Sequence, residues 1–300
     1  KRPRRVPGLW KPVPRYGTEK EGRRDEPDEA RARRSGLNEN YARELMELHT
    51  LGVDGGYTQK DVTEVARCFT GWTIRDPQRG GGFHFDPRMH DNREKTVLGH
   101  KIPAGGGKED GLQVIDILVH HPSTARYVSR RLAERFVSDQ PPAALVEKMA
   151  KTFTKSEGDL RAVLKTMLDS SEFWSEKNWR AKMKSPLEMV SSAVRALDAE
   201  VDFAAGLVQQ LAQLGQPLYR KAEPTGYSNN GEEWVNSAAL LARMNFATAL
   251  ASNRVAGVKV DAEKFGGLRV VSPQTKASIK DATPVQSAGL QIGSPDFQRR

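Results

Sequence analysis

The chain has 300 residues, a hydrophobic fraction of 37%, one cysteine and a formal net charge of +9 at pH 7. This length is enough for one large or two modest domains, and the single Cys68 excludes an internal disulfide and a multi-cysteine metal site. No apolar run approaches the roughly 20 residues that a membrane-spanning helix needs, so we expect no membrane span in this chain.

Most of the net positive charge lies in residues 1–36, which hold twelve Lys and Arg side chains against six acids. This segment is also rich in Pro and Gly and lacks periodic apolar positions, which predicts an irregular or disordered stretch. A sequence such as KRPRR could contact nucleic acid or an acidic partner. Because no surface with interleaved aromatic residues follows it, we favour a solvated segment and do not expect nucleic-acid binding.

The first predicted helix spans residues 39–51, with Asn38 as its N-cap. Tyr41, Leu45 and Leu48 recur at helical spacing, so we expect them to face the core.

A second helix is predicted over residues 59–69. Thr58 followed by Asp61 has the spacing of a capping box at its start. The apolar residues of this helix repeat at helical spacing and predict a buried face, formed by Val62, Val65, Ala66 and Phe69.

Residues 80–102 differ from the helical segments around them. Phe83-His84-Phe85 alternates apolar and polar side chains, a turn-rich stretch DPRMHDN follows, and Thr96-Val97-Leu98 is typical of a strand. We therefore expect a small β-hairpin in this region.

From residue 111 onward the sequence predicts a series of helices. Pro122 suits a first helical turn, and Ser185-Pro186-Leu187-Glu188 combines a capping Ser, a Pro and a Glu at the favoured positions. After Arg254 the periodic pattern weakens. The predicted helices span residues 111–120, 122–137, 142–153, 159–169, 185–197, 203–214 and 232–251.

Together these elements predict a mainly α fold, an irregular multi-helix domain with a small β-hairpin excursion around residues 80–102. We expect residues 1–36 to form a disordered basic segment and residues 37–255 to form the helical domain. Residues 256–300 are predicted to be a weakly structured C-terminal extension of the same domain.

The first predicted helix carries an unusual density of polar groups. Glu39, Arg43 and Glu47 share one face, Glu44 lies beside them, and His49 follows two residues after Glu47. Carboxylates that end in an imidazole could bind a divalent cation. The alternative is a surface ladder of ion pairs worth a few tenths of a kcal/mol per pair, and we favour the ladder because such ladders are commoner than metal sites.

A second polar constellation lies in residues 84–95. His84, His90, Asp91 and Lys95 follow one another closely there. An adjacent His-Asp can serve as a ligand pair or as a base with its orienting acid. The alternative is a turn in which Asp91 caps backbone amides. We favour the turn slightly, unless His49, His90 and Asp91 converge with Glu44 or Glu47.

The helix predicted over residues 122–137 carries four arginines that could pair with acids of the first helix or hold a phosphorylated or sulfated ligand. A solvated basic face is the default interpretation. No GxSxG motif surrounds a serine, and Cys68 falls near the apolar face of the second helix. The four arginines are Arg126, Arg130, Arg131 and Arg135.

Several of these stretches resemble a bacterial family known only as domain-of-unknown-function family 1800. The similar stretches include NENYARELMELHTLGVDGGYTQKDV, ARCFTGW, FHFDPRMHD, HPSTARYVSRRLAERFV, KSPLEMV, GYSNNGEEWVNSAALLARMNFA and SPDFQRR. They cover most of residues 37–300, and the chain looks like the C-terminal two-thirds of a member.

The resemblance implies a helical protein that is exported or periplasmic. Similar proteins are often encoded beside members of another family, number 1501, which looks distantly like sulfatases and alkaline phosphatases. It implies no particular reaction.

Two hypotheses of different class remain open. The chain is either a non-catalytic partner or scaffold for a hydrolase-like protein encoded nearby, with a member of family 1501 as the expected partner, or a metal-dependent enzyme. The enzyme hypothesis predicts a site in which a divalent metal is the possible cofactor and Glu47, His49, His90 and Asp91 are its ligands. The candidate site residues are Arg43, Glu44, Glu47, His49, His90 and Asp91.

Overall fold

The first two helices of the structure pack against each other at the N-terminal end of the described chain. The computed structural model describes residues 37–300, so the predicted disordered segment 1–36 lies outside the described residues. Asn38 caps the first helix by accepting a hydrogen bond from the Tyr41 amide. The elements are α2 (Glu39–Glu44), the π-helical turn η1 (Leu45–Thr50) and α3 (Gln59–Cys68).

The prediction of which side of the first helix faces the core was wrong. Ala42 and Met46 are fully buried, whereas Tyr41 is 48% exposed and Leu45 and Leu48 are half-buried. The helix widens into a π-turn, in which the Leu51 amide donates to the Met46 carbonyl at 2.7 Å. This i→i+5 bond changes the spacing on which the expected apolar stripe was based.

The second helix follows its prediction closely. Thr58 and Asp61 form a reciprocal capping box, and Val62 and Val65 are fully buried. The capping box satisfies amides that would otherwise lack partners at the helix start.

Two hairpins occupy the region where one was expected. In the first, Trp72 pairs with Phe85. In the second, Lys95 pairs with Ile102. The antiparallel strands are β1 (Trp72–Ile74) with β2 (Phe83–Phe85), and β3 (Lys95–Val97) with β4 (His100–Ile102); short 3₁₀ turns η2 (Pro77–Arg79) and η3 (Pro87–Met89) lie next to them.

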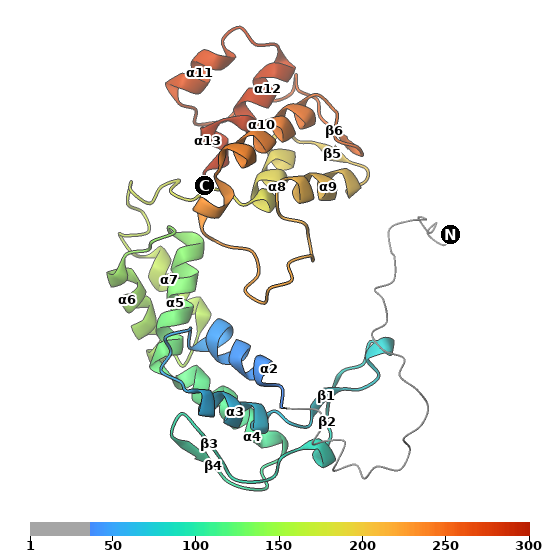
Figure 1. Cartoon of the computed structure of the whole chain (residues 1–300). Coiled ribbons are helices and arrows are strands. Elements are labelled where there is room, and N and C mark those ends of the chain that lie inside the picture. The colour runs from blue at the N-terminus through green and yellow to red at the C-terminus, as the bar shows by residue number, and fades with distance from the viewer. Residues whose placement is uncertain (1–36) are drawn as a thin grey trace. The chain divides into compact units, whose positions relative to one another are not determined.

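Four longer helices follow the hairpins, and α5, α6 and α7 lie side by side (Figure 1). The core shared by α5, α6 and α7 includes Leu145, Met149, Val163 and Met167. The helices are α4 (Lys108–His120), α5 (Pro122–Phe136), α6 (Ala143–Lys155) and α7 (Leu160–Leu168).

The C-terminal part of the chain builds another apolar core from its own helices, around Met189, Phe246, Leu250 and Ile292. The Ser185 and Glu188 capping box predicted at the start of α8 is present. The elements are α8 (Pro186–Ala196), β5 (Glu200–Val201), α9 (Ala205–Gln213), η4 (Gly231–Trp234), α10 (Ser237–Ala251), β6 (Val258–Lys259), α11 (Pro273–Ile279), α12 (Pro284–Gly293) and α13 (Pro295–Gln298).

The single helix predicted over residues 232–251 is interrupted. The 3₁₀ turn η4 ends at Trp234, and Asn236 then caps α10 by accepting a hydrogen bond from the Ala239 amide at 2.8 Å. Residues 256–300, expected to be weakly structured, contain α11, α12 and α13. The mainly α fold with small hairpins is confirmed.

Residues Asn38–Arg300 cluster into one compact unit, and the predicted division at residue 255 stays a prediction. None of the helices formed by residues 37–300 combines the length and apolar character needed to cross a membrane.

Candidate functional site

A polar depression runs along α5. Two adjoining cavities, of about 680 and 870 Å³, share the side chains of Tyr127, Arg130, Arg131 and Glu134. We call this pair of cavities the α5 groove. Its first half is bounded by the loop of residues 221–233, and its second half by the turn of residues 51–54.

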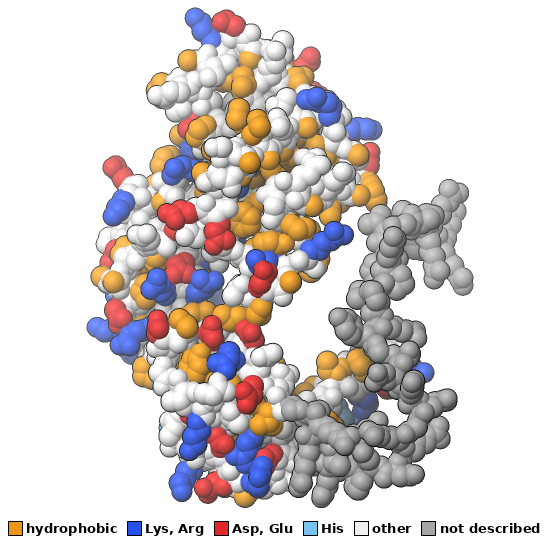
Figure 2. All heavy atoms as spheres, viewed as in Figure 1, with side chains coloured by type: hydrophobic (Ala, Val, Ile, Leu, Met, Phe, Trp, Pro, Cys, Tyr) orange, Lys and Arg blue, Asp and Glu red, His pale blue; other side chains and the backbone are white. Residues whose placement is uncertain are grey.

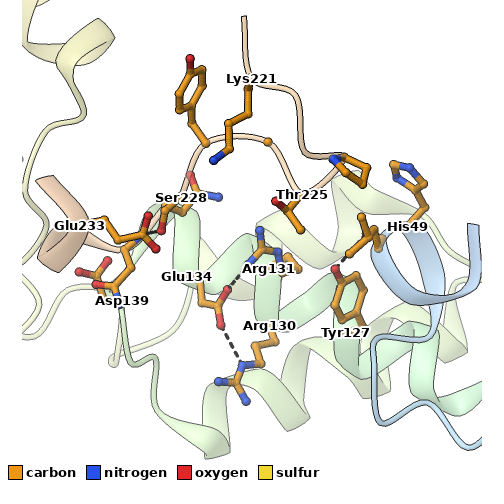
Figure 3. A pocket seen from close by; sticks show the side chains of 16 residues that line it. His49, Tyr127, Arg130, Arg131, Glu134, Asp139, Lys221, Thr225, Ser228 and Glu233 are labelled. Atoms are coloured by element: carbon orange, nitrogen blue, oxygen red, sulfur yellow. Dashed lines mark hydrogen bonds and ion pairs between the residues drawn. The ribbon is translucent and has the colours of Figure 1, made fainter. Parts of the chain in front are cut away.

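Arg130 and Arg131 are fixed at the floor of the groove by one carboxylate. Arg130 Nε donates to Glu134 Oε1, and Arg131 Nη1 donates to Glu134 Oε2, both at 2.8 Å. The Glu134 side chain is 15% exposed. Because both of its oxygens accept a hydrogen bond, Glu134 positions the two guanidinium groups (Figure 3).

Tyr127 joins α5 to the first helix. Its hydroxyl donates to the Leu48 carbonyl at 2.9 Å, and its ring lies against Gly52. A Cβ at residue 52 would come within 2.8 Å of the Tyr127 ring, and the φ of +82° there also favours glycine. The sequence needs Gly52 for this close approach.

Asp139 holds the 221–233 loop beside the groove. It accepts hydrogen bonds from Lys182 and, at 2.8 Å, from the Gly231 amide. Lys182 also donates to the Asn229 carbonyl at 3.1 Å. This loop therefore forms one wall of the groove. Figure 3 shows Lys221 and Arg131 on opposite sides of the groove.

His49 is the one sequence-predicted site residue that lines this groove. It is exposed and has no hydrogen-bond or ion-pair partner among residues 37–300. Arg43 donates to the Gln59 side chain at 2.6 Å, and Glu47 accepts from the Tyr57 hydroxyl at 3.4 Å. Glu44 is half-buried, and its side chain has no hydrogen-bond or ion-pair partner among residues 37–300.

The expected ion-pair ladder of the first helix is replaced by contacts to α3. Glu39 accepts hydrogen bonds from Gln59 at 2.9 Å and from Thr63 at 3.1 Å, while Arg43 also turns to Gln59. These side chains join two helices instead of presenting a row of ligands.

His90 belongs to a buried polar network between the hairpins and α4. Its Nδ1 lies 2.8 Å from the Thr70 carbonyl, and its Nε2 lies 3.1 Å from Asp110 Oδ2. Lys95 donates to the same Asp110 oxygen at 2.6 Å, and the three side chains of His90, Lys95 and Asp110 are all fully buried. The acid that orients His90 is therefore Asp110 and not the adjacent Asp91.

Asp91 is held by two arginines. Arg93 donates to it at 2.6 Å and Arg67 at 2.9 Å. These bonds, led by that of Arg93, hold the pKa of Asp91 well below its usual range despite partial burial. Asp91 Oδ1 also accepts from the Arg93 amide, which is the local turn favoured by the sequence.

The predicted metal ligands are thus placed in different environments, with His49 exposed at the groove, His90 buried against Asp110 and Asp91 held by arginines. Among residues 37–300 no group of three or more His, Cys, Asp or Glu side chains could hold a metal ion. Burial raises the pKa of the Cys68 thiol to about 12, so this thiol stays protonated at neutral pH.

Sequence reasoning identified Arg126, Arg130 and Arg131 as a possible ligand-binding face, but it missed Glu134, Asp139 and the 221–233 loop as parts of the same site. The loop had a usable signal, because TGYSNNGEE is dense in Gly, Asn and Ser. No sequence signal indicated that this loop lies next to α5, because about ninety residues separate Asp139 from Gly231.

The fold and the groove define a mainly helical protein with a polar groove along one arginine-bearing helix. Residues 19–299 match the model of a family described as a protein of unknown function (DUF1800), and the chain belongs to that family. No curated protein and no solved structure matches the chain.

Proposed function

We propose that the chain is a non-catalytic binding partner that takes an extended segment of a second protein into the α5 groove. The observation that carries this proposal is the pair of adjoining cavities on α5. Each is as large as a small-molecule site, which spans about 300–1,000 Å³. Because the two cavities share lining residues on α5, together they form a groove that is longer than a single small ligand.

The charge of the groove favours a polypeptide over a polyanion. Three basic and three acidic side chains line each cavity. Basic and acidic groups are also interspersed over the face seen in Figure 2. Nucleic acid binds to surfaces of one predominant positive sign, whereas a balanced groove complements a segment with mixed charges.

The wall of the groove offers free backbone donors. The amides of Tyr227, Ser228 and Asn229 have no hydrogen-bond partner among residues 37–300. Extended peptides obtain much of their affinity from such main-chain groups, and side-chain pockets add specificity.

Two acids of the groove, Glu134 and Asp139, are already engaged in a way that suits binding better than catalysis. Glu134 is engaged by Arg130 and Arg131, and Asp139 by Lys182 and the Gly231 amide. The alternative of a metal-dependent enzyme has no comparable support, because the Asp91 carboxylate is engaged by two arginines and His90 pairs with Asp110.

From the family resemblance we further propose that the chain acts outside the cytoplasm and that its partner is a hydrolase-like member of family 1501. The test is a binding measurement between the purified chain and a purified member of family 1501, by biolayer interferometry. Arg131→Glu should weaken binding by about tenfold, since it removes a floor cation and opposes Glu134.

Arg161→Glu is the matched control, because Arg161 is exposed on α7 and lies outside the groove. It should leave affinity unchanged. Equal losses for both variants, or no binding of the wild-type chain, would overturn the proposal. Circular dichroism of each variant confirms that both are folded.

A further inference from the structure

A second, smaller cavity lies where the segment before α8 meets the C-terminus. The Lys184 amide donates to the Gln298 carbonyl at 2.9 Å, and the Arg300 amide donates to the Lys182 carbonyl at 2.9 Å. This strand-like pairing fixes the two segments side by side. The cavity has a volume of about 250 Å³ and lies apart from the α5 groove, with which it shares no lining residue.

The cavity is strongly cationic. Four basic side chains line it against a single acid, Asp296. One Asp296 oxygen, Oδ2, accepts hydrogen bonds from Ser272 and Thr275, including one of 2.8 Å from the Ser272 hydroxyl. None of the four cations forms an ion pair within residues 37–300. They are Arg180, Lys184, Arg269 and Arg299.

Lys184 shows the cost of partly burying a cation beside other cations. Its ammonium lies 3.6 Å from the centre of the Phe297 ring. Burial, with smaller contributions from Arg180 and Arg300, lowers the pKa of Lys184 to about 8, against the opposing effect of Glu188. An anion in the cavity would relieve this cost, because a nearby negative charge favours the protonated amine.

An aromatic surface lies at the rim of the same cavity. Trp179 lines it and is 63% exposed, and the Arg180 guanidinium lies 5.4 Å from the centre of its ring. An exposed indole beside arginines can stack on a flat ring while the cations hold an attached anion.

We propose that this cavity binds a small phosphate or sulfate monoester whose ring packs on Trp179. Arg180, Lys184, Arg269 and Arg299 would contact the anionic oxygens, which arginine recognises with paired donors. The volume suits a single ring with one anionic group, since it lies just below the usual range for larger ligands, about 300–1,000 Å³. This site is independent of the protein partner proposed for the α5 groove.

The test is titration of the full chain with phenyl phosphate, phenyl sulfate, inorganic phosphate and phenol, followed by calorimetry and by tryptophan fluorescence. Both phenyl esters should bind, inorganic phosphate should bind more weakly, and phenol should not bind. Phenol binding as well as the esters, or no binding by either ester, would overturn the proposal.

Two tryptophans provide a matched pair for the fluorescence signal. Trp179→Phe should abolish the signal, whereas Trp174→Phe should keep it, because Trp174 is 74% exposed but does not line this cavity. A signal that survives Trp179→Phe and disappears with Trp174→Phe would place binding elsewhere. Arg269→Ala should weaken binding of both esters by about tenfold, and Arg161→Ala should not change it.

The pH dependence separates the two ester classes. A phosphate monoester gains its second charge near pH 6, whereas a sulfate monoester stays singly charged. If the site is built for a dianion, phenyl phosphate should bind more tightly at pH 7 than at pH 5 while phenyl sulfate does not change. Equal pH responses would assign the site to singly charged esters.

Discussion

At the scale of single residues, Lys184 is a cation that the fold makes costly to keep charged. Its pKa falls from 10.5 to about 8 because the side chain is partly desolvated, with Arg180 and Arg300 adding to the effect. Between these two values the unfolded chain binds the proton more readily than the folded chain. The penalty is therefore fully present below pH 8 and disappears as the pH rises towards 10.5.

Replacing Lys184 by Met tests whether the charged side chain lowers the stability of the fold below pH 8. Lys184→Met should raise the free energy of unfolding at pH 7 by about 1 kcal/mol, a value reduced for the partial exposure of the side chain. The gain should vanish near pH 10.5. Urea unfolding at both pH values measures it, with Lys151→Met on exposed α6 surface as the control that should show no such pH dependence. A gain that persists at pH 10.5 would show a packing effect instead.

The buried network of His90, Lys95 and Asp110 shows where prediction from residues stops. A His followed by Asp suggested a local pair, but the partner of His90 comes from α4, twenty positions later. Gly106 completes this arrangement, because a Cβ there would lie 2.0 Å from Asp110 Oδ1. Long-range pairing of this kind leaves no spacing pattern in the sequence, so single residues such as Asp110 could not be assigned.

At the scale of elements, helices with strong local signals were predictable. The capping boxes at Thr58 and Ser185 begin α3 and α8 where expected, since caps are made by residues close in sequence. The failures occur where the helix geometry changes, at the π-turn η1 and at the break between η4 and α10. Such departures depend on packing partners, for example on the buried ring of Trp234, and periodicity does not report them.

The turn after η1 offers a test at this scale. Gly52→Ala places a methyl group 2.8 Å from the Tyr127 ring in a left-handed backbone conformation. It should lower the free energy of unfolding by about 2–3 kcal/mol, which combines backbone strain with overpacking.

Gly56→Ala is the matched control for this substitution. Its φ of +85° is similar, but nothing lies within 4 Å of the added methyl group. Gly56→Ala should lower the free energy of unfolding only by the backbone strain, about 1 kcal/mol. Equal losses in thermal or urea unfolding would mean that contact with Tyr127 contributes nothing.

At the scale of the whole molecule, the candidate site depends on contacts between distant segments. The sequence predicted a mainly α protein and the arginines of α5, because both rest on local patterns. It could not place the 221–233 loop against α5, since this contact is made by Asp139 with Lys182 and the Gly231 amide, and only the folded chain brings them together.

Asp139 is therefore the residue whose loss should release one wall of the groove. Asp139→Ala removes the acceptor of the Gly231 amide and leaves Lys182, which is 2% exposed, with the Asn229 carbonyl as its remaining partner. The unpaired buried cation should lower the free energy of unfolding by about 2–4 kcal/mol. Trypsin should cut faster after Arg220 and Lys221, which are exposed on the freed loop.

A double substitution separates the two roles of Asp139. Asp139→Ala combined with Lys182→Met removes the buried charge as well, so much of the lost stability should return. The loop should stay sensitive to trypsin, because the Gly231 amide still lacks its acceptor. If the double variant recovered both stability and trypsin resistance, Asp139 would serve only to neutralise Lys182, and the wall of the α5 groove would be fixed by other contacts.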